Sequence, residues 1–129
     1  MARLLTTEDR VAREACLGGW AGFAITLAIV WIIGGVMEEM AFRGYLLKRI
    51  AARVGGRRRT IAGYVISSLY FGLSHWYQRP AGVISALSFG LFVGALFLYS
   101  GGNLFLAIIA HGIYDTAGIG LLALHVTGW

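Results

Sequence analysis

The chain has 129 residues, of which 58% are hydrophobic and 13% are charged, and its formal net charge is +5. Soluble domains usually carry about 25% charged residues, so this composition excludes an ordinary soluble domain and predicts one membrane-embedded domain over residues 1–129. Six of the eleven Lys and Arg residues lie between Lys48 and Arg59, which indicates a cytoplasmic loop facing anionic lipid rather than a nucleic-acid partner.

Residues 1–17 mix acidic residues with three arginines. That is not the basic start and immediate apolar core of a signal peptide, so we expect a short interfacial or connecting segment. The first apolar stretch runs from Gly18 to about Met37. Its helix is predicted to continue through two adjacent glutamates, Glu38 and Glu39, to about Val54.

Three further apolar segments follow, at about residues 61–76, 83–99 and 104–126. The first of these is short for a helix that must cross a hydrocarbon core of ~30 Å, which takes ~20 residues. The loops between segments, expected at 55–60, 77–82 and 100–103, are tight enough to make neighbouring helices antiparallel. The sequence therefore predicts an all-α fold, a polytopic membrane helical bundle with about four transmembrane helices. The spacing Gly90-x-x-x-Gly94 predicts close helix packing within the chain.

Ionisable residues from three of these segments share a band of depth. At a rise of ~1.5 Å per residue, Glu38 lies roughly 15 Å from the basic end of its helix, His75 roughly 21 Å and His111 roughly 12 Å. The positive-inside rule puts that end in the cytoplasm. Because carboxylates and imidazoles are costly in a bilayer and usually functional there, the agreement suggests one catalytic site inside the membrane.

The two glutamates have different expected partners. Glu39 and Arg43 stand at i,i+4 with the acid first, which favours a helical ion pair, whereas Glu38 points elsewhere. Two carboxylates this close in a low dielectric do not both ionise readily. One of them is thus a candidate general acid or base, and the alternative is a solvated structural pair at the interface.

The later segments carry the motifs Phe71-x-x-x-His75 and His111-x-x-x-Asp115. Phe71 can pack against the His75 imidazole one turn later, and Asp115 can fix the orientation of the His111 ring as outer-shell carboxylates do. The alternatives are a hydrogen-bonded core histidine for His75, and an internal hydrogen bond that neutralises His111 and Asp115 in lipid.

Two mechanisms fit these residues. In the first, which we favour, Glu38 and His75 polarise a water that attacks a peptide carbonyl while His111 stabilises the oxyanion. In the second, Glu38, His75 and His111 bind Zn²⁺, which activates the water, although no His-Glu-x-x-His helix is present. A Ser74–His75 dyad or a haem held by both histidines would leave the carboxylates unused.

In order along the chain, Glu38-Glu39-x-x-x-Arg43, Phe71-x-x-x-His75 and His111-x-x-x-Asp115 resemble the three motifs of the CAAX protease and bacteriocin-processing family. The resemblance covers residues 34–118, and the family includes the type II CAAX prenyl proteases. It implies an intramembrane endopeptidase with a polar cavity open to the cytosolic side. It further implies that Glu38 activates water with His75, that His111 supports the oxyanion or a metal, and that Arg43 orients Glu39.

The resemblance also implies the substrates and the location. Eukaryotic relatives cleave prenylated C-terminal tails, and many bacterial relatives are associated with bacteriocin maturation or self-immunity. We therefore expect a peptide or prenylated protein substrate, and an integral protein of a bacterial inner membrane with its active site toward the cytosolic face. The alternative from another class is a non-catalytic immunity or scaffold protein that binds a peptide or a partner helix.

The chain departs from the family pattern in two ways. Asp115 stands where the last motif often has Asn, and an ionised carboxylate only accepts hydrogen bonds. Asp115 is therefore either protonated or orients His111. The chain is also short for the family, as expected of a minimal homologue or a truncated piece.

Overall fold

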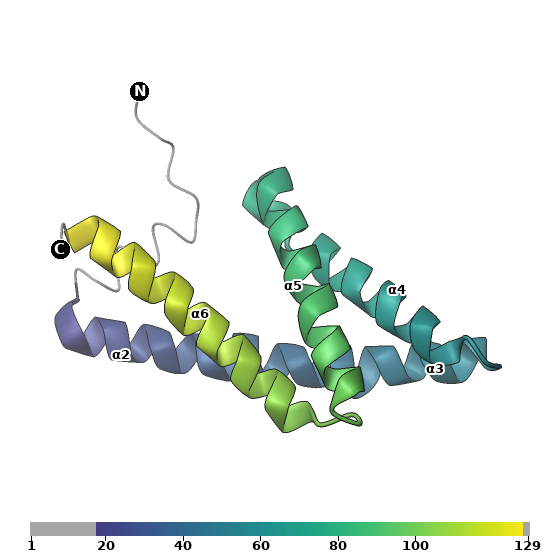
Figure 1. Ribbon diagram of the computed structural model, residues 1–129. Coiled ribbons are helices and arrows are strands. Elements are labelled where there is room, and N and C mark those ends of the chain that lie inside the picture. The colour runs from purple at the N-terminus through teal and green to yellow at the C-terminus, as the bar shows by residue number, and fades with distance from the viewer. Residues whose placement is uncertain (1–17, 128–129) are drawn as a thin grey trace.

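The computed structural model describes residues 18–127, and in that range the backbone forms only helices and the turns between them (Figure 1). The predicted interfacial segment at residues 1–17 lies outside the described residues. The elements in chain order are α2 (Gly19–Ile29), η1 (Val30–Glu38), η2 (Met40–Leu47), α3 (Lys48–Val54), α4 (Arg59–Ser74), η3 (Trp76–Gln78), α5 (Arg79–Tyr99) and α6 (Leu104–Thr127). The first four run on as one helical rod (Figure 1).

The predicted all-α membrane bundle is confirmed. Within the described residues, three helical stretches are long and apolar enough to cross a membrane, namely Gly19–Val54, Trp76–Tyr99 and Leu104–Leu121. The remaining helix, α4, has 16 residues, in keeping with the short apolar segment seen in the sequence.

The middle of the rod differs from the ordinary α-helix that the apolar pattern predicted. Both η1 and η2 are π-helices, and Glu39 is the residue between them. The wider π turn is rare and occurs frequently at functional sites. Glu38 and Glu39 thus lie at the junction of the two wide segments.

The loop predicted at residues 77–82 is wrong. The chain makes one turn of 3₁₀-helix, η3, and then enters α5 at Arg79. Pro80 lies in the first turn of α5, where its missing N–H has no helical partner to lose and its fixed φ suits the helix. Pro80, which the predicted loop included, therefore lies at the start of a helix.

The helices pack around one small core. Short turns fold α4 back along α3 and η2 and place α5 against α4, while α6 returns across η1 (Figure 1). The buried apolar core consists of Leu47, Phe71, Ala86, Phe89, Val93, Phe97 and Ala107. Phe71 of α4 is 1% exposed and lies at the junction with the rod and α5.

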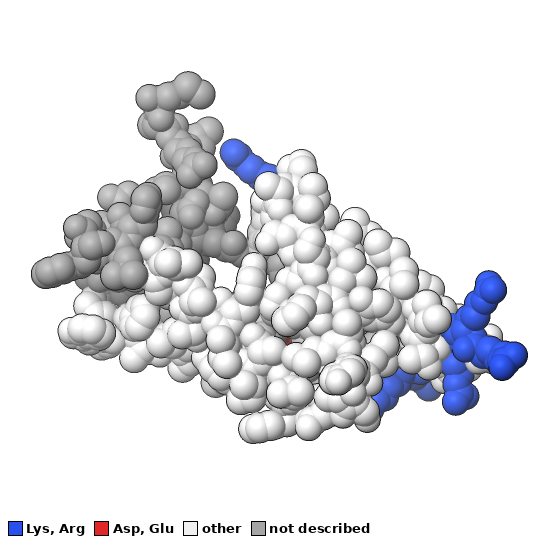
Figure 2. All heavy atoms as spheres, in the orientation of Figure 1, with Lys and Arg blue, Asp and Glu red and all other residues white. Residues whose placement is uncertain are grey.

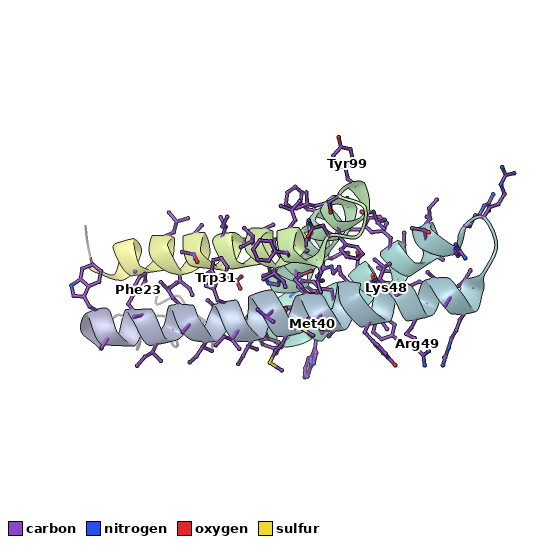
Figure 3. All side chains as sticks on the ribbon, turned by 90° about the horizontal axis from the view of Figure 1, so that it is seen from below. Phe23, Trp31, Met40, Lys48, Arg49 and Tyr99 are labelled. Atoms are coloured by element: carbon purple, nitrogen blue, oxygen red, sulfur yellow. The ribbon has the colours of Figure 1, made fainter. Side chains whose placement is uncertain are left out.

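The outer surface is largely apolar, as a lipid-facing surface should be. Figure 3 shows Trp31 between the rod and α6, whereas Met40 projects from the open side of the rod. Basic side chains gather at the end of the molecule where α3 turns into α4 (Figure 2). Most of the positive charge of the described residues therefore lies at one end, and the exposed Arg79 at the start of α5 is separate from it (Figure 2).

Glycines allow the closest approaches between helices. A Cβ at Gly90 would lie 3.0 Å from the Phe71 ring, and one at Gly94 would lie 2.9 Å from the Tyr64 ring. The Gly90-x-x-x-Gly94 spacing therefore serves packing of α5 on α4 within the chain, as predicted. Gly63 is tighter still, because a Cβ there would lie 2.6 Å from the Leu47 carbonyl oxygen.

Gly63→Ala is expected to lower the free energy of unfolding by about 1–3 kcal/mol, because the obstructing atom is backbone and two helices must separate. Chemical denaturation in mixed micelles measures the loss. Gly44→Ala is the matched control, since its nearest atom would be an ordinary 3.6 Å away and removal of a helical glycine gains up to about 1 kcal/mol. Equal effects of the two substitutions would contradict the close contact.

Candidate active site

The site is built around the fully buried carboxylate of Glu39. Its Oε1 accepts a hydrogen bond from Arg43 Nη1 at 2.6 Å and lies 2.7 Å from His111 Nδ1. Because Glu39 is held as a carboxylate by the arginine, Nδ1 of His111 is the donor. This hydrogen bond fixes the orientation of the His111 ring, whose Nε2 then faces away from Glu39.

Two further carboxyl groups face that second nitrogen. Asp115 Oδ2 lies 3.6 Å from His111 Nε2, and Glu38 Oε2 lies 4.0 Å from the same atom. The carboxyl groups of Glu38 and Asp115 are 30% and 24% exposed, whereas that of Glu39 is 0% exposed. The partner that orients His111 is therefore Glu39, and not Asp115 as its i,i+4 spacing had indicated.

Arg43 joins the site to the core. Its second nitrogen, Nη2, donates to the Gly90 carbonyl at 2.9 Å, and its guanidinium lies 4.8 Å from the centre of the Phe71 ring. The predicted i,i+4 ion pair with Glu39 is confirmed. Arg43 is 1% exposed, so the charge is taken up wholly by the carboxylate, the carbonyl and the ring face.

His75 directly follows the last residue of α4, one helical turn after Phe71. The Phe71 ring lies 4.8 Å from the His75 ring and 5.9 Å from the His111 ring, so the predicted Phe71–His75 packing is confirmed. His75 Nδ1 lies 2.8 Å from the Phe71 carbonyl oxygen. A carbonyl can only accept, so Nδ1 carries the proton and Nε2 of neutral His75 has a free lone pair.

The structure brings together the residues that the motifs singled out. Glu38, Glu39 and Arg43 come from the rod, and His111 and Asp115 come from α6. His75, the residue after α4, interacts electrostatically with Glu38 and Asp115. The rod and α6 thus bring three carboxylates and an imidazole into one cluster, and the part that His75 takes in it stays a prediction.

Residues that the motifs did not single out hold α6 against the rod. Trp31 Nε1 donates to Thr116 Oγ1 at 3.0 Å, and the Trp31 ring covers Gly112 so closely that a Cβ there would lie 2.6 Å away. A Cβ at Gly34 would lie 2.7 Å from Asp115 Oδ2. Gly34 precedes Glu38 by one helical turn, which is the signal that could have identified it.

Comparison with known proteins identifies the family of the chain. The family model of Rce1-like type II CAAX prenyl endopeptidases matches residues 20–117. The chain belongs to this family. The matched range contains the whole cluster from Glu38 to Asp115, and the protein is accordingly an integral membrane protein of an intramembrane protease family. No curated protein and no solved structure is significantly similar to the chain.

The predicted Zn²⁺ ligands are Glu38, His75 and His111. In the part of the chain that the structure describes, no group of three His, Cys, Asp or Glu side chains is arranged to hold a metal ion. The Nδ1–H groups of His111 and His75 are given to Glu39 and to the Phe71 carbonyl, which leaves Nε2 of each ring free. A metal requirement therefore stays a prediction for this Rce1-like protein.

A serine nucleophile also fits this site poorly. Ser74 Oγ lies 3.2 Å from His75 Nδ1, but it donates to the Phe71 carbonyl at 2.8 Å. Because Nδ1 is itself a donor to that carbonyl, it cannot remove a proton from Ser74. A Ser74–His75 dyad therefore has no base.

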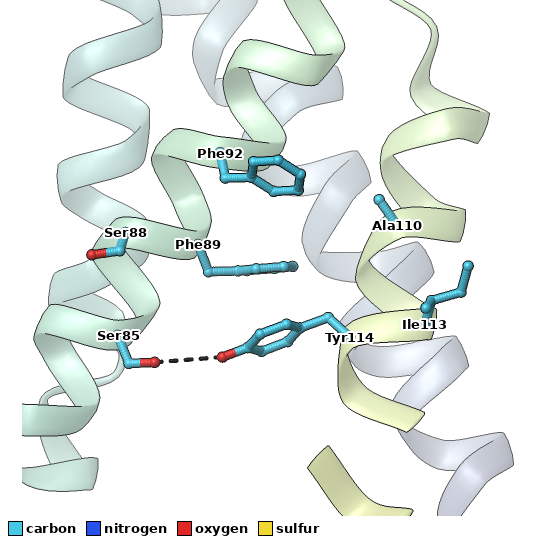
Figure 4. Close-up of a pocket in the computed structure, with 7 residues that line it drawn as sticks. All are labelled: Ser85, Ser88, Phe89, Phe92, Ala110, Ile113 and Tyr114. Atoms are coloured by element: carbon cyan, nitrogen blue, oxygen red, sulfur yellow. Dashed lines mark hydrogen bonds between the residues drawn. The ribbon is translucent and has the colours of Figure 1, made fainter. Parts of the chain in front are cut away.

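A groove of about 640 Å³ opens beside the cluster, between α5 and α6 (Figure 4). Its floor includes Phe89, whose ring lies 4.8 Å from the His111 ring and stacks on Tyr114 at 4.3 Å. The Tyr114 hydroxyl reaches across to Ser85 Oγ at 3.4 Å. The complete lining is Ser85, Ser88, Phe89, Phe92, Ala110, Ile113 and Tyr114. No sequence pattern predicted this groove, which is mostly apolar and open and whose lining residue Phe89 packs against the His111 imidazole.

Proposed function

We propose that this protein is an endopeptidase that hydrolyses a peptide bond in the membrane by means of a water activated by Glu38 and His75. The observation that carries the proposal is the convergence on His111. Its Nδ1 is held by the buried Glu39, and its Nε2 faces the carboxyl group of the partly exposed Glu38 side chain. Family membership supports the reaction class, and the positions of the side chains support the roles.

Glu38 and His75 prepare the water. Glu38 is the cluster carboxylate with the greatest exposure and has no arginine partner, so it can take a proton. His75 Nε2 presents a lone pair because its Nδ1–H is given to the Phe71 carbonyl. A water that donates one proton to each group presents its own lone pair to the scissile carbonyl carbon.

His111 receives the charge that develops on the carbonyl oxygen. With Nδ1–H given to Glu39, only Nε2 can face the substrate, and it donates when the ring is an imidazolium. Glu39 and Arg43 do not touch the substrate in this mechanism, and they act as positioning residues that hold the imidazole in place.

The substrate we propose is a peptide or prenylated C-terminal protein segment that is presented from the bilayer. The apolar groove between α5 and α6 supports this, because it lies beside the site, with only the Phe89 ring between it and the His111 ring. The basic end of the molecule supports an active site toward the cytosolic face of a bacterial inner membrane. A bacteriocin-type peptide is the other substrate that we propose for the same chemistry.

The test is cleavage of a farnesylated CAAX-type peptide, and of its unprenylated form, by the full chain in liposomes, with products identified by mass spectrometry. His75→Ala is expected to lower kcat by about 10²–10⁴, the usual contribution of a general acid or base. Ser74→Ala is the matched control and should retain wild-type turnover, whereas a serine mechanism requires its complete loss.

Wild-type protein that binds these peptides without ever cleaving them would contradict the proposal and favour a non-catalytic immunity or scaffold role. Undiminished cleavage by His75→Ala would remove His75 from the mechanism.

A further inference from the structure

Asp115 occupies a place that the proposed mechanism has not used. Its carboxyl group comes from α6 and meets that of Glu38, from η1, at the same nitrogen of His111, with distances of 3.6 and 4.0 Å. Three features place Asp115 there. Gly34 leaves room for its carboxylate beside the rod, and His111 lies one turn before it on α6. The Trp31–Thr116 hydrogen bond fixes α6 against the rod.

The positions of these groups determine how many protons they must share. Glu39 is satisfied as a carboxylate by Arg43 and by the Nδ1–H of His111. If Glu38, Asp115 and Nε2 were all unprotonated, three sets of lone pairs would face one another in a low dielectric, which is strongly unfavourable. The cluster therefore requires at least one proton shared among these three groups.

The other groups near Asp115 do not remove the need for this shared proton. The rod contributes Glu38, Glu39 and Arg43, and the last two neutralise each other. His75, the residue after α4, interacts with Asp115 through space, while its own Nδ1–H is given to the Phe71 carbonyl. From α5, the uncharged ring of Phe89 packs against the His111 ring. No cation other than a protonated histidine stands opposite Asp115 among these groups.

We propose that Asp115 is the proton donor to the leaving amine, and that His111 returns the proton to it from Glu38. This inference rests on the proposed function. As water attacks, its oxygen bonds to the carbonyl carbon and its proton passes to Glu38. When the C–N bond breaks, the electron pair goes to nitrogen, which takes the proton of Asp115. His111 then gives its Nε2 proton to Asp115 and takes the proton of Glu38 at the same nitrogen, so the site is restored and one water is consumed.

The role is specific to an aspartate at this position. The family motif often has Asn there, and an amide donates a hydrogen bond but cannot give up a proton in hydrolysis. The geometry thus assigns to this chain an acid–base group that an Asn-bearing relative would need to find elsewhere.

Asp115→Asn separates proton donation from the other possible roles. With a farnesylated peptide cleaved at an amide bond, kcat should fall by about 10² or more. With the matching peptide phenyl ester, whose leaving group needs no proton, kcat should stay within a few-fold of wild type. The decline of the amide rate at high pH, which reports loss of the shared proton, should disappear. Equal losses on both substrates, or no loss on either, would overturn the proposal.

Gly34→Ala moves the carboxyl group without removing it. A Cβ at Gly34 would occupy the space of Asp115 Oδ2, the flexible end of a side chain, so the fold should survive and the amide-specific loss should recur. Gly35→Ala is the matched control, because its nearest atom would be 3.5 Å away. Wild-type amide turnover in Gly34→Ala would count against the assigned position.

A spectroscopic measurement keeps the inference distinct from the proposed function. The infrared difference spectrum between wild type and Asp115→Asn, in liposomes near neutral pH, should contain the carbonyl stretch of a protonated carboxylic acid. If wild-type protein cleaves neither peptide, the proposed function fails, and this band still decides whether Asp115 holds a proton. Absence of the band at every pH at which the protein is folded would overturn the inference.

Discussion

Glu38→Gln is expected to lower kcat for peptide cleavage by about 10²–10⁴ while the protein keeps its fold. The amide has the shape of the carboxylate but cannot take a proton from water. The Glu38 side chain is 30% exposed. Its Oε2 lies 4.0 Å from His111 Nε2, which is too far for a hydrogen bond, and the side chain forms no hydrogen bond within the described part of the chain. Its replacement therefore removes the base without leaving a buried group unsatisfied.

The control for this prediction is Met37→Leu, a volume-conserving change at the preceding position of the rod, whose side chain is 59% exposed. It should change neither turnover nor stability. The affinity of Glu38→Gln for the peptide should remain near that of wild type, since the base acts in the chemical step. Retained turnover in Glu38→Gln would show that another group activates the water.

Most of the helical organisation could be predicted from the sequence, because apolar segments of this length have few alternatives in a bilayer. The rod was expected to end near Val54 and does so, and α6 begins at Leu104 as expected. The Glu39–Arg43 pair and the Phe71–His75 contact followed from helical spacing alone. These features depend on local periodicity, which a sequence states directly.

The parts that could not be predicted depend on how separate helices meet. Whether His111 is oriented by Asp115 or by Glu39 is decided by the rotation of α6 against the rod, and i,i+4 spacing suggested the wrong partner. The π-helical turns around Glu38 have no pattern in the apolar residues. Phe89, which separates the groove from the site, looks in sequence like any other core aromatic residue.

The Glu39–Arg43 pair gives the second large expected effect, this time on stability. Arg43→Met would leave the Glu39 carboxylate at 0% exposure with only His111 to oppose it, although its Oε2 already lacks a hydrogen-bond partner. Removal of one partner from a buried ion pair costs about 3–5 kcal/mol. The free energy of unfolding in mixed micelles should fall by that amount. Arg49→Met, which removes an exposed cation over the Tyr45 ring, should lose no more than about 1 kcal/mol.

The double variant Glu39→Gln/Arg43→Met tests whether the loss comes from the uncompensated charge. With no buried carboxylate left, it should recover much of the stability lost in Arg43→Met, because two neutral groups carry a smaller desolvation penalty. It should not recover turnover, since His111 Nδ1 then faces an amide instead of the carboxylate that holds it at 2.7 Å. A double variant as unstable as Arg43→Met would place the loss in the contacts of the guanidinium with Gly90 and Phe71. Recovered turnover in the double variant would show that the orientation of His111 does not depend on the charge of Glu39.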